Sequence, residues 1–509
     1  MTHDTATTTS RSAVGLRSER GPVLLAVMLC TALVAIDATI LAAAVPAVVS
    51  DLGGFSQFPW LFSIYLLAQA VSVPIYGKLA DSLGRKPVML VGIALFLLGS
   101  ILCGAAWTMP LLIASRVVQG LGAGAVMPMS ITIIGDIYSV EERARVQGFI
   151  ASVWGIASIV GPTLGGVFSE YVSWRWIFFV NLPIGAIATV MLLRGFHESI
   201  ERKRHRIDYA GAALLAGGVS LLILALLEGG RSWEWLSPTG IGIVVASVVL
   251  LVGFLFVEKR APEPILPLWV FTRRVLVGAN AASLVIGAVL IGLTSYVPTF
   301  AQGVLGFGAL LSGLALGAMT IGWPLAAASA GRIYMRFGFR NTSFLGVAFV
   351  VLGSALLLLV DARTSLWTIA AFTFLVGVGL GYASVPTLVA VQSSVDWDRR
   401  GVVTATNLFA RSVGSAIGVA VFGAIANATL SRDFARPPAG ATGPLPKTAD
   451  DAAVVLGGGT GVSATVRDFV REALTGATHQ VFLGVVVLAV AMVLAVLVMP
   501  RRTEPLRFD

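Results

Sequence analysis

The chain has 509 residues, of which 57% are hydrophobic and only 12% are charged, and its mean hydropathy is +0.89. A soluble domain cannot bury that much apolar surface, so the composition indicates a protein that crosses a membrane many times. The net charge of +9 does not indicate nucleic-acid binding, because the basic residues stand in short loops between apolar runs, where they fix topology. The two cysteines lie inside apolar runs and the four histidines form no cluster, so neither a disulfide framework nor a metal site is predicted.

Long apolar runs follow one another along the whole chain. A spanning helix needs about 20 mostly apolar residues, and about fourteen runs meet that length. The predicted spans are residues 22–45, 57–77, 87–107, 109–130, 147–169, 176–194, 209–227, 239–257, 275–296, 308–330, 342–360, 366–390, 401–426 and 480–499. The short alternating segments of transmembrane strands are absent from the sequence. The predicted fold class is therefore an all-α membrane protein.

The charges between the spans predict the orientation. Basic residues gather in alternate loops, namely those that a cytoplasmic N-terminus would place inside. The tails 1–21 and 501–509 are therefore predicted to be cytoplasmic. The tail 1–21 is not a signal peptide, because the apolar run after it is too long and no small-residue cleavage site closes it. The Pro- and Gly-rich stretch 429–478 is predicted to be an irregular extracellular loop.

The segment GKLADSLGRK, residues 77–86, returns at half-chain distance as GRIYMRFGFR, residues 331–340. Further landmarks recur at nearly the same offset: Pro46 with Pro298, the glycine ladders 120–124 and 377–381, and Gly148, Gly161 and Gly165 with Gly401, Gly414 and Gly418. Repeated halves around a central site are how secondary transporters build alternating access. We expect two six-helix halves, residues 22–194 and 275–500, with two inserted helices in 195–274.

These motifs resemble the major facilitator superfamily, and within it the fourteen-helix drug:proton antiporters. GKLADSLGRK resembles the signature of the loop between helices two and three. IDATILAAAVP, residues 36–46, resembles the first-helix signature, with Ala42 where asparagine is usual. The resemblance implies the major facilitator fold, with two pseudo-symmetric halves, and a location in a bacterial cytoplasmic membrane.

Three later segments carry the same resemblance. SRVVQGLGAG, residues 115–124, resembles the fourth-helix motif with its intramembrane arginine. ASIVGPTLGG, residues 157–166, resembles the fifth-helix antiporter motif, which implies roles for Gly161, Pro162, Gly165 and Gly166, although Ala157 stands where glycine is common. WRWIFFVNLPIG, residues 174–185, is typical of the family at the entry to helix six. Proline and the glycines are expected to break and thin the fifth span.

Asp37 is the sharpest single candidate for the mechanism. A carboxylate inside lipid is costly, so we expect it to face a cavity. It is read as a proton site, a contact for a cationic substrate, or both in competition, with a hydrogen-bonded structural aspartate as the alternative. The matching position in the repeat is Val289, so the fold does not demand an acid there. Arg116 must find an acid or backbone carbonyls. The resemblance implies a role for it in proton relay, and a structural pin between helices is the alternative.

The segment 77–86 carries a candidate cytoplasmic gate. Its glycines Gly77 and Gly84 belong to this gate together with the charged residues. The resemblance implies that Asp81 meets helix ends of the other half and that Arg85 bridges to Asp136, which stabilises the outward-facing state. At a wet interface such ion pairs contribute about 1 kcal/mol or less each. The second copy lacks the acid, so a one-sided latch is expected.

Asn407 and Arg411 stand one helical turn apart in the thirteenth span, as a polar pair that could bind substrate or balance Asp37. An arginine bonded to carbonyls is the alternative. No phosphate-binding loop is present, so an ion gradient is the expected energy source, and no cofactor or enzymatic activity is expected. The resemblance implies that the ion is a proton. The leading hypothesis is a monomeric, proton-coupled antiporter of lipophilic or amphiphilic drugs or toxic compounds. Export of a lipid or another endogenous amphiphile is the alternative, and nutrient uptake by symport is disfavoured.

Overall fold

The computed structural model describes residues 15–16, 18–53, 60–198, 208–230, 233–262, 264, 266–307, 309–436 and 464–502. Among these residues, fourteen helices or helix pairs are long and apolar enough to cross a membrane. This confirms the predicted all-α membrane fold. The tails 1–14 and 503–509 lie outside the described residues.

The first half contains helices α1 to α7: α1 (Gly21–Leu52), α2 (Trp60–Leu83), α3 (Arg85–Gly104), α4 (Met109–Ile137), α5 (Val140–Tyr171), α6 (Trp176–Phe179) and α7 (Asn181–Gly195). The short α6 and α7 together form one span. The inserted pair is α8 (Tyr209–Glu228) and α9 (Pro238–Glu258).

The second half contains α10 (Arg274–Gly303), α11 (Ala309–Phe337), α12 (Phe339–Leu356), α13 (Leu366–Ser393), α14 (Arg400–Phe434) and α16 (Ala464–Val498). Three short 3₁₀ turns accompany them: η1 (Leu268–Phe271), η2 (Leu357–Leu359) and η3 (Trp397–Arg399).

Polar side chains directly before apolar runs begin several of these helices. The Ser365 side chain accepts a hydrogen bond from the backbone N–H of Thr368 at 3.2 Å at the start of α13. Before α5, Ser139 and Glu142 form a reciprocal capping box. Such caps satisfy N–H groups that the first helical turn leaves free, so the helices begin where a polar turn meets an apolar run.

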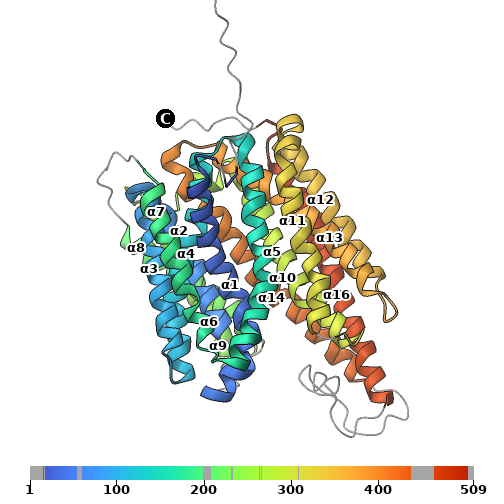
Figure 1. The fold of residues 1–509 in the computed structure, drawn as a ribbon. Coiled ribbons are helices and arrows are strands. Elements are labelled where there is room, and N and C mark those ends of the chain that lie inside the picture. The colour runs from blue at the N-terminus through green and yellow to red at the C-terminus, as the bar shows by residue number, and fades with distance from the viewer. Residues whose placement is uncertain are drawn as a thin grey trace, which may run out of the picture.

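Each half has its own apolar core, one built by α10–α14 with α16 and the other by α1–α7. Figure 1 shows the two halves side by side, close together at one side of the molecule and diverging toward the other. The described chain ends, before α1 and after α16, both lie on the close side, which we call the terminal side; the opposite one is the far side. On the terminal side the helix ends of the two halves meet. Access from that side to a site between the halves therefore has to pass these helix ends.

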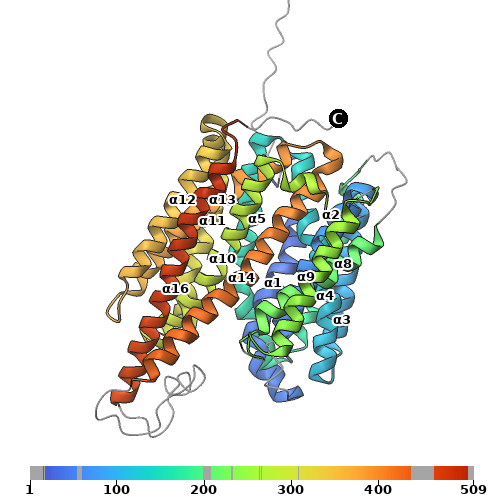
Figure 2. The same ribbon diagram turned by 180° about the vertical axis from the view of Figure 1, so that it is seen from behind.

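The inserted pair covers one of the two seams between the halves. Leu215 and Phe254 of the pair join a buried cluster with Val71 of α2 and Ala416 of α14. Figure 2 shows α8 and α9 on the side of the molecule where α2 is seen. The opposite seam, between α5 and α11, is in front in Figure 1. The insertion therefore makes the two seams unlike each other.

The prediction of an irregular loop over residues 429–478 is wrong at both of its ends. Helix α14 runs to Phe434 and α16 already begins at Ala464. These extensions pack together through an apolar cluster that includes Leu430, Val466 and Val470. Apolar residues recur at helical spacing among the charged residues of these extensions. Because they pack against one another, both helices continue beyond the apolar runs. Residues 437–463 of the predicted loop lie outside the described residues.

Candidate functional site

Asp37 lies deep in the first half, where α1 meets α4. It stands about 24 Å along α1, since each residue adds about 1.5 Å. Its side chain is only 1% exposed, as is that of Arg116 on α4. Arg116 Nη1 donates to Asp37 Oδ2 at 2.6 Å. The intramembrane acid and the intramembrane base of the sequence thus form one buried ion pair. The expectation that Asp37 faces a cavity is wrong for this structure, since neighbouring helices of the first half enclose its carboxylate.

Three uncharged polar side chains complete this site. Gln119 Nε2 donates to Asp37 Oδ1 at 2.7 Å and to Ser100 Oγ at 2.9 Å. Asn181, the first residue of α7, has its Nδ2 3.5 Å from Asp37 Oδ1 and 3.3 Å from Ser100 Oγ. Helices α1, α3, α4 and α7 therefore meet in a single hydrogen-bonded cluster, which we call the acid cluster: Asp37, Ser100, Arg116, Gln119 and Asn181.

Arg116 is also held from the other side by α2. Its Nε donates to the backbone carbonyl of Leu61 at 3.0 Å. The guanidinium carbon lies 4.2 Å from the ring centroid of Tyr65, a cation–π contact. Because these contacts do not involve Asp37, they hold the guanidinium in place whether or not Asp37 carries a proton.

The acid cluster has a second possible arrangement of hydrogen bonds. Within the described residues, Asn181 Oδ1 is buried and has no hydrogen-bond partner. A turn of the amide would bring this oxygen to the Asp37 carboxyl in place of the nitrogen. The oxygen would then accept from a protonated Asp37, while the nitrogen donates to the ionised form. The geometry therefore fits both protonation states of the acid.

Sequence reasoning named Asp37 and Arg116 but missed the neutral members of the cluster. Gln119 follows Arg116 by three residues, a spacing that places both side chains on one helix face. Asn181 is the only amide within the apolar segment 174–185. The sequence therefore held two signals for the neutral members of the cluster: the spacing of Gln119 from Arg116, and the single amide in the apolar segment.

The segment 77–86 forms a second charged cluster, on the terminal side. Arg85 Nη2 lies 3.1 Å from Asp81 Oδ1, and Arg85 Nε lies 2.9 Å from Asp136 Oδ2 at the end of α4. The structure thus brings together the three charges predicted for the gate. We call Asp81, Arg85 and Asp136 the latch.

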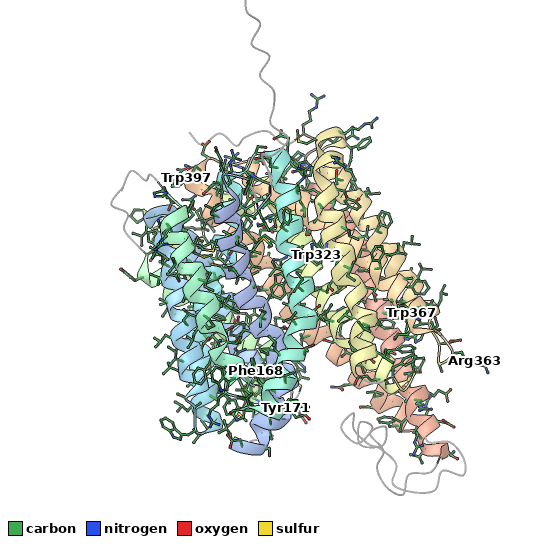
Figure 3. All side chains as sticks on the ribbon, viewed as in Figure 1. Phe168, Tyr171, Trp323, Arg363, Trp367 and Trp397 are labelled. Atoms are coloured by element: carbon green, nitrogen blue, oxygen red, sulfur yellow. The ribbon has the colours of Figure 1, made fainter. Side chains whose placement is uncertain are left out.

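The latch reaches across to the second half. Asp81 accepts from the backbone N–H groups of Gly401 and Val402, each at 2.8 Å, and so caps the N-terminus of α14. An acid at this place is favoured by the partial positive charge of the helix end. Arg400 Nη1 lies 3.0 Å from Asp136 Oδ1, and the Arg85 guanidinium stacks 3.7 Å above the Trp397 ring. Figure 3 shows Trp397 on the terminal side.

The expectation of a wet latch with weak ion pairs is wrong. The Arg85 side chain is fully buried, and those of Asp81 and Asp136 are 7% and 9% exposed. The close packing of α2 and α14 excludes water here, since a Cβ on Gly77 would lie 2.4 Å from that of Ala405. Removing one member would leave a buried charge without its partner, which costs far more than breaking a surface pair.

Two further features anchor the latch. Gly84 has φ 98° at the N-terminus of α3, a backbone conformation that favours glycine. The Glu198 carboxylate accepts from the backbone N–H groups of Arg85 and Lys86, each at 3.0 Å, and so caps α3. Sequence reasoning missed Glu198, which lies in the connection that leads to the inserted pair. The latch is therefore tied to that connection as well as to α14.

Comparison of the sequence with known proteins identifies the family of this chain. A sequence model of the Major Facilitator Superfamily matches residues 27–419. The chain belongs to the Major Facilitator Superfamily. Multidrug resistance protein 3 of Bacillus subtilis (strain 168) is 35% identical over 403 residues, covering 79% of each chain. The multidrug transporter protein MdtP of the same organism is 34% identical over 417 residues, covering 82% of this chain and 77% of its own.

Solved structures of the superfamily share the fold at low sequence identity. The human organic anion transporter MFSD10 is 15% identical, with a TM-score of 0.61 over 92% of this chain and 99% of its own. The proton:xylose symporter XylE is 12% identical, with a TM-score of 0.57 over 93% of this chain and 94% of its own. At these identities the likeness concerns the fold alone.

The second copy of the superfamily loop makes a different contact. Tyr334, which stands beside the position that matches Asp81, donates its hydroxyl to the backbone carbonyl of Val140 at the start of α5. The acid of the first copy accepts from helix N–H groups, whereas the tyrosine of the second donates to a carbonyl. Both copies touch a helix start of the opposite half, but only the first does so with charge.

The superfamily's antiporter motif lies in α5, which remains helical from Val140 to Tyr171. The predicted break at Pro162 is therefore wrong, since loss of one backbone hydrogen bond does not end this long helix. A Cβ on Gly161 would lie 2.0 Å from Thr39 Oγ1, so α1 and α5 approach closely there. Gly165 is buried, whereas a Cβ on Gly166 would meet open space.

The contacts shift the expected match between α5 and α14. Gly418, and not Gly414, packs against Ile291, which matches Thr39 when the two prolines of the repeat are aligned. Gly414 packs instead against Leu284. The sequence spacing therefore matched Gly161 to Gly414, which lies one helical turn from Gly418. In packing, the equivalent of Gly161 is Gly418.

The predicted pair on α14 separates into two kinds of residue. Asn407 is buried and bonds within the second half, accepting from Ser283 Oγ at 2.9 Å and donating to the carbonyl of Ala279 at 3.2 Å. Arg411 is only partly buried. The structure therefore assigns Asn407 to packing against α10 and does not join it to Arg411.

Proposed function

We propose that this protein is a proton-coupled antiporter that exports lipophilic or amphiphilic compounds across the cytoplasmic membrane by alternating access. The observation that carries the proposal is the buried pair of Asp37 and Arg116, whose surroundings accommodate both protonation states of the acid. The names of the curated relatives, which are multidrug transporters and efflux pumps, support the direction of transport.

The latch supports a particular state of the cycle. Basic loops gather on the terminal side, so this side is the cytoplasmic one and both chain termini lie in the cytoplasm. With Asp81 capping α14, the halves are closed toward the cytoplasm, and the helices diverge toward the far side (Figures 1 and 2). Asp37 then takes up a proton from outside, and the substrate leaves in exchange.

Coupling needs only that proton and substrate prefer different states of the acid cluster. Protonation of Asp37 removes the negative charge that pairs with Arg116, and ionisation of the acid restores the ion pair. A ligand shifts such an equilibrium by its difference in affinity for the two states. The gradient supplies the energy without a cofactor, and one chain carries both halves, so a monomer suffices.

The test uses proteoliposomes with an imposed pH gradient and a lipophilic fluorescent dye. Wild type is expected to move the dye against protons, and Asp37→Asn is expected to lose gradient-driven movement while still binding the dye. Asp361→Asn, which removes an exposed acid between α12 and α13, is the matched control and is expected to behave as wild type. Normal exchange by Asp37→Asn would refute the assignment, and dye movement along with the protons would indicate symport.

A further inference from the structure

Helix α7 connects the acid cluster with the latch. At its first residue, Asn181, the side-chain Nδ2 lies 3.5 Å from Asp37 Oδ1. At its other end, Lys86 Nζ, beside the latch, donates to the backbone carbonyls of Leu193 at 3.0 Å and of Phe196. Asn181 and Leu193 are separated by about 18 Å of helix. One helix therefore contacts Asp37 at its beginning and the latch segment at its end.

Between these two ends α7 is packed as one rigid element. One face of the helix forms a buried stripe, made of Asn181, Gly185, Ala188 and Leu192. Ala188 and Leu192 belong to the apolar core that α7 shares with α1, α3 and α4. Close-packed cores have discrete arrangements and do not deform continuously. A change at the first residue of α7 is therefore expected to move the helix as a whole.

Two reciprocal caps tie the end of α7 to the latch. Lys86 binds carbonyls at the C-terminal end of α7, and Glu198, just after that end, accepts from the backbone N–H groups of Arg85 and Lys86 at the start of α3. A cation at a helix C-terminus and an acid at a helix N-terminus are both favoured by the partial charges of the helix ends. Movement of α7 therefore acts on the backbone of Arg85, a latch residue.

The two amides of the acid cluster differ in how firmly they are held. Gln119 uses both ends of its amide, since Oε1 accepts from Arg116 at 2.7 Å and Nε2 donates to Asp37 at 2.7 Å. Asn181 Oδ1 has no partner within the described residues, and its Nδ2 lies 3.3 Å from Ser100 Oγ and 3.5 Å from Asp37 Oδ1. A proton on Asp37 turns the carboxyl into a donor, which the free oxygen of Asn181 can accept. The bonding of Asn181 therefore depends on the proton.

The other groups around Asp37 respond less to its proton. The charged or titratable side chains that face it are Arg116 on α4, Tyr65 on α2 and Cys103 on α3. Helices α5 and α7 carry none at this depth. Arg116 keeps its contacts with the carbonyl of Leu61 and the ring of Tyr65 in either state. The contact that changes character with the proton is therefore the one made by α7.

We propose that Asn181 and Lys86 are positioning residues that couple the protonation of Asp37 to the latch through α7. When Asp37 is protonated, the Asn181 amide turns and α7 shifts. This shift loosens the hold of Lys86 and Glu198 on the start of α3, and the latch opens toward the terminal side. When Asp37 is ionised, α7 returns and the latch closes. The inference rests on the proposed function, because it takes Asp37 as the proton site.

The test measures latch opening in reconstituted vesicles without a pH gradient. The readout is the labelling rate of Thr404→Cys by a membrane-impermeant maleimide applied from the terminal side. Asp37→Asn stands in for the protonated acid and is expected to raise this rate about tenfold, the worth of one hydrogen bond to a charged group. In backgrounds that carry Asn181→Leu or Lys86→Gln, the same substitution is expected to change the rate less than about twofold, because the coupling is cut.

Two further backgrounds separate coupling from a general loosening of the protein. Arg340→Gln is the matched control, because Arg340 matches Lys86 in the repeat and its guanidinium lies over Phe344 of its own helix. Lys86→Arg keeps a cation that can reach the same carbonyls. Both are expected to retain the tenfold response to Asp37→Asn. Since each response is a ratio within one background, a change in the basal rate does not affect it.

A tenfold response that survives in both Asn181→Leu and Lys86→Gln would overturn the inference, as would the absence of a response in the wild-type background. Lys86→Gln lies at the helix ends, so it gives a result even if Asn181→Leu does not fold. Dye movement in the pH-gradient assay separates the two proposals. Loss of dye movement in Asp37→Asn, with a labelling response that ignores α7, contradicts the coupling alone. The expected labelling pattern, with normal dye exchange by Asp37→Asn, contradicts antiport alone.

Discussion

The two halves of the protein make the same backbone contact with different side chains. In the first half, Arg116 on α4 donates to the carbonyl of Leu61 on α2 at 3.0 Å. In the second half, Thr373 on α13 donates to the carbonyl of Ala315 on α11 at 2.6 Å. The two pairs occupy matching places in the repeat. The hydrogen bond therefore belongs to the scaffold, and the charge on Arg116 is an addition to it.

Asp37 and Gln119 of the acid cluster also differ from the residues that match them in the second half. Asp37 is matched by Val289, which is fully buried in the apolar core of the second half. Gln119 is matched by Val376, and the two pack against matching glycines of α3 and α12. A duplicated fold thus supports an apolar core in one copy and a polar cluster in the other. The repeated fold therefore does not by itself require the polar residues of the acid cluster.

The largest effect is expected from Arg116→Leu, set against Thr373→Val. The first leaves Asp37 buried without a cation and should lower the free energy of unfolding by about 3–5 kcal/mol. The second removes one neutral hydrogen bond and should cost about 1 kcal/mol. Denaturant unfolding in detergent measures both. Adding Asp37→Asn to Arg116→Leu should recover much of the loss, and equal costs in the two halves would break the comparison.

The latch offers a second comparison, between Asp81→Asn and Tyr334→Phe. Loss of the charged cap of α14 should raise opening toward the terminal side about tenfold or more, and loss of one tyrosine hydrogen bond about fivefold. The readout is the labelling rate of a cysteine introduced at the buried Thr404 by a membrane-impermeant maleimide, applied from the terminal side. A larger effect from Tyr334→Phe would contradict a charged, one-sided latch.

An effect of similar size is expected from Gly77→Ala, with Gly166→Ala as its control. The new methyl group at Gly77 would overlap that of Ala405, so α2 and α14 must separate at a cost of about 1–3 kcal/mol. At Gly166 the methyl group would enter open space and should change little. The same labelling assay, together with unfolding, reports both. Identical behaviour of the two variants would show that α2 and α14 are not closely packed at Gly77.

The smallest effect concerns two matching serines, Ser100 and Ser354. Ser100 accepts hydrogen bonds from Gln119 and Asn181, whereas Ser354 Oγ is buried without a partner in the described residues. Ser100→Ala should cost about 1 kcal/mol of unfolding free energy, and Ser354→Ala should be neutral or slightly stabilising. A cost at Ser354 would show that its hydroxyl is bonded in the protein.

The fold was predictable from the sequence because length and hydropathy alone define a spanning helix. The ends of α14 and α16 were not, because outside the membrane their helical state depends on packing against each other, through residues such as Leu430 and Val470. The break expected at Pro162 failed for a related reason, since α5 is held along its length by its neighbours.

The charged members of the site were predictable one by one, since an acid or a base inside a span is rare and costly. Their partners were not, because pairing Asp37 with Arg116 requires the relative rotation of α1 and α4. The neutral residues Gln119 and Asn181 carried too little signal by themselves. The burial of Arg85 was also hidden, because it depends on how closely the two halves approach.

The most direct test of the central claim, that the proton is carried by the first half alone, is the proton release on substrate binding. The purified protein in weakly buffered detergent solution is mixed with an uncharged lipophilic fluorescent dye, and a pH indicator follows the protons. Wild type and Thr373→Val are expected to release protons alike, and Asp37→Asn none. Undiminished release from Asp37→Asn would contradict the account.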